Sequence, residues 1–486
     1  MTAHEPFPSL LIGPTGIGAQ GSFAEAQAAY LDPDPAEVAE LGRLLRDKNA
    51  GVVAHFYMDP ELQGVLAATD WPLIHISDSL VMADRAVEMA KAGAKAIVVL
   101  GVDFMSENVR AMLDAGGFSE LPVYRVADQA IGCSLADSAE APAYGAYLTL
   151  ASKTPKSLHV VYINTSLRTK AYAHSLVPTI TCTSSNVVRA VLTAFAQVPG
   201  LHVWFGPDTY MGQNLARLFA SLCELSDDKI RALHPEHDRA SIAALLPRFH
   251  YFEQGSCIVH HMFGAAVAER VRTEYRDAFV TAHLEVPGEM FGVALEAQRR
   301  DAGVVGSTSD ILGFIGQKVD AAAAGGAPAH LRFVLGTEAG MITSIVRRVR
   351  ETLRELEGRG GPSVDVEIVF PVASEAVAQT GDAELAIVPG VAGGEGCSTE
   401  GGCATCPYMK MNSLDALLSV LGRVDVGARA LLAGHEPKHY ADTIAGKTMA
   451  ELGGQPILHM RGLGKLGRLP DALVADVLSR TPKSPV

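Results

Sequence analysis

The chain of 486 residues lacks several features that would place it in particular protein classes. No stretch approaches the eighteen or more apolar residues that a membrane-spanning helix requires, so a membrane protein of that type is not expected. Lys and Arg number 40 against 54 Asp and Glu, a net charge of −14 that argues against a nucleic-acid partner. The N-terminus lacks a basic segment followed by a long apolar run, which predicts no secretory signal and a cytoplasmic protein.

Cysteine is also scarce, with seven in the whole chain. So few in a long chain without an export signal are expected to act as ligands, catalysts or core residues rather than as a disulfide framework. Three of them, Cys133, Cys257 and Cys406, lie far apart in the sequence, each in a polar or glycine-flanked loop. Cys182 and Cys223 are expected to be packed residues.

What the chain has in abundance is an α/β pattern. Short runs rich in Val, Ile and Leu alternate with segments whose apolar residues recur every three and four positions, which favours parallel sheets with right-handed crossovers. Helices are expected at 39–50, in SLVMADRAVEMAKAG and in SIVRRVRETLRELE, and a helical segment is indicated at SFAEAQAAYL. Strands are expected at AIVVLGV and LRFVLGT.

Three stretches of the chain repeat one order of strand endings. The first strand of each ends in a histidine, tyrosine, asparagine or glutamate, the second in hydroxyls, and the third in a glycine. These residues are His55 and Tyr57, Tyr162 and Asn164, His283 and Glu285; Ser77 and Ser79, Ser184 and Ser185, Ser307 and Thr308; and Gly101, Gly206 and Gly336. Ser79 and Ser184 are 105 positions apart, as are Gly101 and Gly206.

The repeat predicts three α/β units, each followed by one of the three distant cysteines. The expected parts are a lead-in over 1–38, units over 39–132, 133–256 and 257–412, and a C-terminal helical tail over 413–486 that packs on the core. The tail is expected to begin with the helix SLDALLSVLGRV and then to become loop-rich, and 376–395 is expected to be an irregular connector.

The polar strand endings predict where chemistry occurs, because ligands of parallel α/β sheets bind beyond the carboxyl ends of the strands. Hydroxyls ahead of a helix either cap it or bind an anion. His55, Tyr57, Tyr162, His283 and Glu285 are candidates for proton transfer, the alternative being contacts with a neighbouring unit. Cys133, Cys257 and Cys406 together could hold an iron–sulfur cluster with one iron open as a Lewis acid. A zinc site made by Cys397, Cys403 and Cys406 with a histidine is the alternative.

Ten motifs occur in order between His55 and Asn412. They are HFYMDPELQ, GVDFMSE, YINTS, CTSSN, FGPD, GSCIVH, AHLEVPGE, GSTS, GTEAGM and CPYMKMN. With these motifs the chain resembles the quinolinate synthase family, and IGCSLADSAEAPAY is similar to its plant-type branch, whose added sulfur-transfer domain is not found in this sequence. The family often has HPE where this chain has His283-Leu284-Glu285, so the turn there is expected to differ.

The resemblance implies an architecture, a cofactor and a reaction. The architecture is three homologous three-layer αβα domains with short parallel sheets around a pseudo-threefold axis and the active site at the centre. The cofactor is a [4Fe–4S] cluster, whose ligands by motif would be Cys133, Cys257 and Cys406. The reaction condenses iminoaspartate with dihydroxyacetone phosphate and yields quinolinate with loss of phosphate and two waters.

The resemblance also implies roles for individual residues. Ser79, Ser184, Ser307 and Thr308 would hold substrate carboxylates or phosphate. His55 and His283 would contact the substrate, Tyr57 and Tyr162 would move protons, Asn164 would orient the substrate, and Glu285 would be an acid/base near the open iron.

Other readings of the same residues remain. A cluster-dependent hydro-lyase of the aconitase kind would share the three cysteines, and a non-catalytic metal-binding scaffold would share the metal without turnover. An iminoaspartate-producing enzyme and cluster-assembly proteins are the expected partners, and a monomer or homodimer is the expected state.

Overall fold

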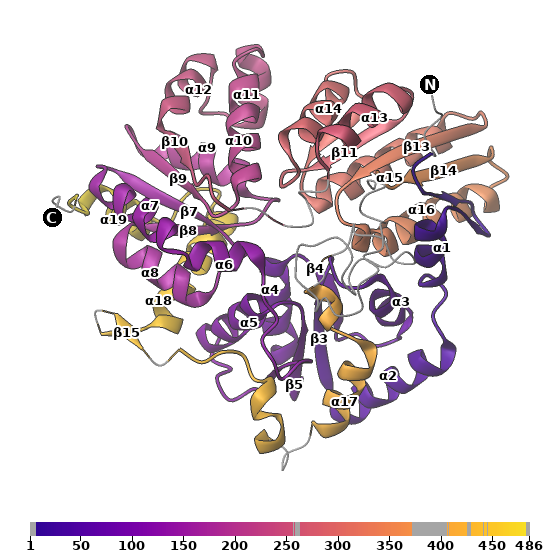
Figure 1. The fold of residues 1–486 in the computed structure, drawn as a ribbon, viewed down its shortest axis with the longest axis horizontal. Helices are drawn as coiled ribbons and strands as arrows, with labels where there is room; N and C mark the ends of the chain where they lie inside the picture. The colour runs from indigo at the N-terminus through magenta and orange to yellow at the C-terminus, as the bar shows by residue number, and fades with distance from the viewer. Residues whose placement is uncertain are drawn as a thin grey trace, which may run out of the picture. The chain divides into compact units, whose positions relative to one another are not determined.

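The computed structural model describes residues 6–255, 257, 263–371, 406, 408–424, 429–440, 442–444 and 446–482. The fold is α/β, with several short parallel sheets (Figure 1). The chain forms two compact units. Unit 1 comprises Met1–Ala50, Ala54–Ile76 and Ile258–Arg429, and unit 2 comprises Gly51–Val53, Ser77–Cys257 and Ala430–Val486. None of the described helices combines the length and the apolar character needed to cross a bilayer.

Unit 1 contains a six-stranded sheet of order β12-β11-β13-β14-β1-β2. Its parallel strands are β11 (Phe279–His283), β12 (Gly303–Gly306), β13 (Ala329–Gly336) and β14 (Val364–Val369). The helices along this part of the chain are α13 (Ala265–Glu274), α14 (Gly288–Gln298), α15 (Thr308–Ala324) and α16 (Ile342–Gly358).

The N-terminal segment adds two strands to this sheet. β1 (Ser9–Ile12) pairs antiparallel with β14 and with β2 (Ile17–Gln20), and α1 (Ser22–Ala29) follows. Leu10 and Ile12 are fully buried in the same apolar core as Ile368. The expected lead-in is therefore a structural part of unit 1.

Unit 2 contains a four-stranded parallel sheet of order β10-β9-β7-β8. Its strands are β7 (Ser157–Tyr162), β8 (Thr179–Cys182), β9 (His202–Gly206) and β10 (Phe249–Tyr251). Its helices are α6 (Ser134–Glu140), α7 (Pro142–Lys153), α8 (Leu167–Leu176), α9 (Val187–Gln197), α10 (Thr209–Leu222), α11 (Asp227–Leu233) and α12 (Arg239–Leu245).

The remaining four-stranded sheet has the order β4-β3-β5-β6. Its strands are β3 (Ala50–His55), β4 (Ile74–Ser77), β5 (Ala96–Leu100) and β6 (Val123–Arg125). The helices along this part of the chain are α2 (Pro35–Lys48), α3 (Pro60–Ala68), α4 (Ser79–Lys91) and α5 (Asp103–Ala115).

When β1 and β2 are left aside, the three sheets share one strand order. In each, the second strand along the chain lies at one edge, the first is next to it, and the third and fourth follow, as in β4-β3-β5-β6. The strand endings that the sequence pattern aligned therefore occupy equivalent places in three sheets. Each set of polar endings lies at the carboxyl edge of its own sheet, where ligands of such folds bind.

Most of the expected helices and strands are confirmed, because their apolar spacing matches one buried face. In α16, Ile345, Val349 and Leu353 recur every four residues and all are buried. The helix expected at 39–50 begins earlier, at Pro35, where the Asp34 carboxylate accepts a hydrogen bond from Ala36 N. It ends at Lys48, and the next residue, Asn49, adopts the left-handed conformation that terminates helices.

The prediction that the tail becomes loop-rich after its first helix is wrong, because two further helices form there. After α17 (Leu414–Arg423), a 3₁₀ segment covers Arg429–His435, β15 (Thr443–Ile444) pairs with β16 (Lys447–Thr448), and two helices follow. These are α18 (Met449–Leu466) and α19 (Asp471–Ser479).

Helix α18 forms although it contains Pro456 and several glycines, which disfavour helices in isolation. A capping box between Thr448 and Glu451 begins the helix. Packing against α8 explains one of the glycines, since a β-carbon on Gly453 would lie 2.3 Å from Leu167 O. Tertiary contact therefore outweighs local propensity here.

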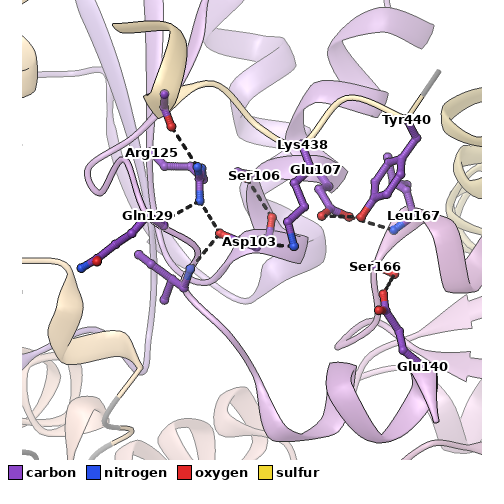
Figure 2. Close-up of polar contacts among 12 residues, drawn as sticks. Asp103, Ser106, Glu107, Arg125, Gln129, Glu140, Ser166, Leu167, Lys438 and Tyr440 are labelled. Atoms are coloured by element: carbon purple, nitrogen blue, oxygen red, sulfur yellow. Dashed lines mark hydrogen bonds and ion pairs between the residues drawn. The ribbon is translucent and has the colours of Figure 1, made fainter. Parts of the chain in front are cut away.

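Acidic residues of the GVDFMSE motif bind the C-terminal segment to the rest of unit 2. Asp103 Oδ1 accepts hydrogen bonds from Arg125 Nη1 at 2.6 Å and from Ile131 N at 3.1 Å (Figure 2). Arg125 Nη2 donates to Gly434 O at 3.0 Å, and Lys438 Nζ lies 3.5 Å from Asp103 Oδ2. The buried Asp103–Arg125 pair therefore holds the chain around residues 434–438.

Glu107 forms the second of these attachments. Its Oε2 accepts a hydrogen bond from Leu167 N at 2.9 Å and its Oε1 accepts one from Tyr440 OH at 3.0 Å (Figure 2). Burial raises the pKa of Glu107, and burial lowers the pKa of the fully buried Lys170 to about 7. The opposite charges of Glu107 and Lys170 attract, which partly offsets both effects.

Glu107→Ala is expected to lower the free energy of unfolding of the full chain by about 3–5 kcal/mol, the usual cost of leaving a buried charge without its partner. Lys170 would lose the opposite charge that, within the described part of the chain, raises its pKa, and Leu167 N and Tyr440 OH would lose their acceptor. Chemical denaturation at pH 6 measures the loss, with exposed Glu120→Ala as the control. The difference should shrink at pH 9, where Lys170 is neutral when folded; a loss under about 1 kcal/mol at pH 6 would contradict this role.

Candidate active site

In unit 1, strand β11 ends in a buried histidine next to a buried glutamate. His283 and Glu285 are 1% and 2% exposed, and His283 Nδ1 lies 3.7 Å from Glu285 Oε1. His283 Nδ1 also accepts a hydrogen bond from Glu285 N at 3.4 Å. This contact favours the tautomer that carries its proton on Nε2, and both side chains are withdrawn from bulk water.

A second pair from β3 lies beside them. Tyr57 N donates to His55 Nδ1 at 3.1 Å, and the ring centres of His55 and Tyr57 are 4.9 Å apart. The Tyr57 ring centre lies 6.3 Å from that of His283. Burial lowers the pKa of His55 to about 4, with Glu285 opposing and His283 adding to the shift. His55 is therefore neutral near pH 7 and presents Nε2–H as a hydrogen-bond donor.

Gln63 holds this loop in place, a role that the sequence reasoning missed. Its buried Nε2 donates to Phe56 O at 2.9 Å, Met58 O at 2.8 Å and Gly340 O at 2.8 Å. A β-carbon on Gly340 would lie 2.6 Å from Phe56 O, so this approach requires glycine. Gln63 and Gly340 both belong to motifs noted in the sequence, HFYMDPELQ and GTEAGM. Their positions in the sequence alone, however, do not indicate that the two residues contact each other.

Glu338 is another buried residue that the sequence reasoning did not single out. It precedes the 3₁₀ turn Ala339–Met341 and is 2% exposed. Its pKa is raised well above the usual value by burial first and then by the charge of Glu285. Burial and the neighbouring carboxylate thus both favour the protonated form of Glu338.

Ser307 and Thr308 follow β12, the strand next to β11. Strands β11 and β12 pair so that His283 is opposite Gly306, which brings the two hydroxyls to the strand end that carries His283. Ser307 Oγ accepts from Asp310 N at 3.2 Å and donates to Asp310 Oδ2 at 2.7 Å. The Ser307 hydroxyl therefore caps α15, as the capping alternative required, and Thr308 is the first residue of that helix.

Unit 2 has a corresponding set of side chains at its own strand ends. Tyr162 ends β7 and is 5% exposed, and Asn164 follows, half-buried. In the paired strand β8, Cys182 is opposite Tyr162, and Ser184 lies two residues further on, half-buried. Thr183 N donates to Asn186 Oδ1 at 2.9 Å, which fixes the turn into α9.

Ser79 is the first residue of α4 in unit 2, and its hydroxyl lies at the start of that helix. Asp78 caps the helix, with Oδ1 accepting from Leu80 N at 2.9 Å and Val81 N at 3.0 Å. The side chain of Ser79 is buried, and no described residue hydrogen-bonds its Oγ. Because buried hydroxyls are normally hydrogen-bonded, this oxygen is suited to bind a ligand at the helix start.

The three cysteines are all half-buried and lie outside strands. Cys133 precedes α6, Cys257 follows β10, and Cys406 precedes the 3₁₀ segment Met409–Met411. Cys182 is buried at the end of β8, where burial raises the pKa of its thiol, and Cys223 directly follows α10. Within the described ranges no three His, Cys, Asp or Glu residues form a group that could hold a metal ion. Cys397, Cys403 and the connector 376–395 lie outside the described residues.

Residues 39–357 match the sequence model of the family described as "Quinolinate synthetase A protein". The chain belongs to the quinolinate synthase family. It is 57% identical over 487 residues to "Quinolinate synthase, chloroplastic" of Nicotiana tabacum, an alignment that covers 98% of this chain and 68% of the tobacco protein. The Arabidopsis thaliana protein of the same name is 56% identical, with coverage of 98% and 68%. "Quinolinate synthase" of Thermosynechococcus vestitus is 32% identical over 59% of this chain and 71% of its own length.

This membership confirms the predicted activity, so the protein is an enzyme, a quinolinate synthase that acts in NAD biosynthesis. The prediction of a cytoplasmic location is wrong, because the similar tobacco, Arabidopsis and rice proteins are named chloroplastic. That prediction rested on the lack of a secretory-type N-terminus, which cannot distinguish the cytoplasm from a plastid.

Proposed function

We propose that this quinolinate synthase condenses iminoaspartate with dihydroxyacetone phosphate at a site built from its three parallel sheets. The observation that carries the proposal is identity above 50% over 98% of the chain to enzymes named for this activity. The three α/β units would surround a pseudo-threefold axis. The common strand order of the three sheets supports this arrangement, since equivalent edges could then face one centre.

Cys133, Cys257 and Cys406 would hold a [4Fe–4S] cluster. Their chemistry fits, because such clusters are bound by thiolates, and each of these cysteines follows the fourth strand of one parallel sheet. All three are half-buried, which suits a cluster that a substrate must reach. When bound through three thiolates, the cluster supplies an iron with an open position that can act as a Lewis acid.

The hydroxyls at helix starts would recognise the anionic groups of the substrates. Ser79 supports this best, because its buried Oγ has no hydrogen-bond partner among the described residues and lies at the first turn of α4. Thr308 begins α15 in the same way, and its amide and hydroxyl would bind a carboxylate or phosphate. Ser307 would contribute mainly by holding that turn, and Ser184 would add a hydroxyl at the end of β8.

Proton transfer would fall to Glu285, Tyr57 and Tyr162. Glu285 is buried beside His283, which suits a base that abstracts a proton and returns it to a departing hydroxyl as water. His55 and His283 would donate hydrogen bonds to substrate oxygens from Nε2, and Asn164 would orient the substrate. A site closed to bulk water would protect the imine of iminoaspartate from hydrolysis.

The test is an anaerobic assay of cluster-reconstituted protein with dihydroxyacetone phosphate and iminoaspartate made in situ from oxaloacetate and ammonia. We expect quinolinate and one phosphate per quinolinate. A hydro-lyase would instead dehydrate a hydroxy acid without dihydroxyacetone phosphate, and a scaffold would bind metal without turnover. In the cell, an imine-producing enzyme would supply the first substrate and cluster-assembly proteins the cofactor, with the enzyme acting as a monomer or homodimer.

A further inference from the structure

Lys170 is a fully buried cation that the chemistry described so far does not use. It is the fourth residue of α8, and its Nζ group donates hydrogen bonds to Ile163 O at 3.0 Å and to Thr165 O. Moving an ammonium group out of water is costly, whereas an apolar side chain of similar length would fill this position without that cost. The two carbonyl groups that it binds therefore indicate what Lys170 contributes.

The two bound carbonyl groups flank Asn164, the residue proposed to orient the substrate. Ile163 O belongs to the peptide bond that joins Ile163 to Asn164, and Thr165 is the next residue along the chain. In this stretch, 162–166, called the Asn164 loop below, Asn164 is half-buried while the other residues are buried. The direction of the Asn164 side chain depends on the backbone that Lys170 binds.

Hydrogen bonds within the Asn164 loop reinforce this arrangement. Thr165 N donates to Ile163 O at 2.7 Å, and Thr165 Oγ1 donates to Tyr162 O at 3.1 Å. Ile163 N donates to Cys182 O of the neighbouring strand β8 at 2.8 Å. Ile163 O thus accepts hydrogen bonds from both Thr165 and Lys170. The lysine therefore attaches a turn that begins on the sheet to helix α8.

The part of α8 from which Lys170 reaches the Asn164 loop is itself fixed. Glu107 Oε2 accepts a hydrogen bond from the N–H group of Leu167, the first residue of α8, and Glu107 Oε1 accepts one from Tyr440 OH (Figure 2). The Glu107 carboxylate also attracts the Lys170 ammonium group and raises the pKa of Lys170 against the effect of burial. A residue of α5 and one of the C-terminal segment therefore hold the start of α8 in place.

We propose that Lys170 is a positioning residue for the reaction, which fixes the Asn164 side chain in the orientation that the substrate requires by binding the carbonyl groups of the residues on either side. Lys170 acts only through the Asn164 loop and transfers no proton. Misplacing an active-site group by about 1 Å can reduce turnover about 100-fold, so a small shift of this loop is sufficient to matter. The inference rests on the proposed role of Asn164.

Hydrogen–deuterium exchange of the full chain, followed by mass spectrometry, tests whether Lys170 holds the loop. Lys170→Met removes the donors and keeps a long apolar side chain. The amides of the Asn164 loop should exchange at least about tenfold faster in this variant than in the wild type, because local opening becomes easier. If Lys170→Met does not fold, Lys170→Gln, whose side chain is too short to reach both carbonyl groups, replaces it with the same expectation.

Ala173→Gly is the matched control. Ala173 is also buried in α8, and glycine there disfavours the helix by about 1 kcal/mol without touching either carbonyl group. Exchange of the Asn164 loop should match that of the wild type in this variant. Wild-type exchange in Lys170→Met, or equal acceleration in both variants, would overturn the proposal.

A double-mutant cycle separates positioning from a merely structural role. Lys170→Met should lower kcat/KM of the cluster-reconstituted enzyme about 10- to 100-fold, with an unchanged cluster spectrum. In the Asn164→Ala background the same change should cost at most about threefold, because the side chain that Lys170 positions is already absent. Losses that multiply fully would refute the coupling, and Ala173→Gly should keep the wild-type value.

The exchange measurement does not depend on turnover, so the two proposals can fail separately. A loop that loosens in Lys170→Met in a protein that makes no quinolinate from iminoaspartate and dihydroxyacetone phosphate would contradict the proposed function. An unchanged loop in an active enzyme would contradict this inference alone.

Discussion

Replacing Cys133, Cys257 or Cys406 by alanine is expected to abolish the iron–sulfur absorbance and quinolinate formation together. Each variant would retain two of the three proposed thiolates, too few to hold a cluster that already leaves one iron open. All three cysteines are half-buried, so the substitution leaves no large cavity and the fold should persist. Iron and sulfide content and the visible spectrum of anaerobically reconstituted protein measure the loss, and circular dichroism checks the fold.

Cys223→Ala is the matched control. Cys223 is also half-buried, but it directly follows α10 and is not a proposed ligand. It should keep full iron, sulfide and activity. A complete cluster in any of the three ligand variants would refute the ligand assignment. Loss of the cluster in Cys223→Ala would mean that the comparison does not identify which cysteines bind the cluster.

Glu285→Gln is expected to reduce kcat by about 10²- to 10⁴-fold, the usual contribution of a positioned acid/base group. Glutamine keeps the size and polarity of the buried side chain but cannot accept a proton. The cluster spectrum should not change, because Glu285 is not among the proposed ligands. Anaerobic assays at saturating substrate measure kcat, and binding of a substrate analogue tests whether the site still forms.

Glu289→Gln is the control. Glu289 lies four residues after Glu285 and is exposed in the first turn of α14, so this variant should have wild-type rates. A Glu285→Gln enzyme with normal turnover would remove Glu285 from the mechanism. Loss of the cluster in the same variant would assign Glu285 to cofactor binding instead.

Sequence patterns were sufficient for much of the fold. Helices such as α16 have an apolar face with regular spacing, and buried parallel strands such as β5 are continuous Val, Ile and Leu runs, so local periodicity identifies both. Periodicity failed for β1, a strand of only four residues, and for α18, where Gly453 and Pro456 disfavour a helix. In both cases the partner element, β14 or α8, stabilises a structure that the segment would not form alone.

The sequence by itself determined the α/β class, the threefold recurrence of strand endings and the family, because these depend on local periodicity and on motifs in order. It also pointed to His55, Tyr57, His283 and Glu285 as residues at strand ends. Only the tertiary structure decided that Gln63 joins the loops after β3 and β13, and that burial and the charge of Glu285 raise the pKa of Glu338. Such contacts join residues separated by tens to hundreds of positions, and their energies depend on burial, which no local pattern records.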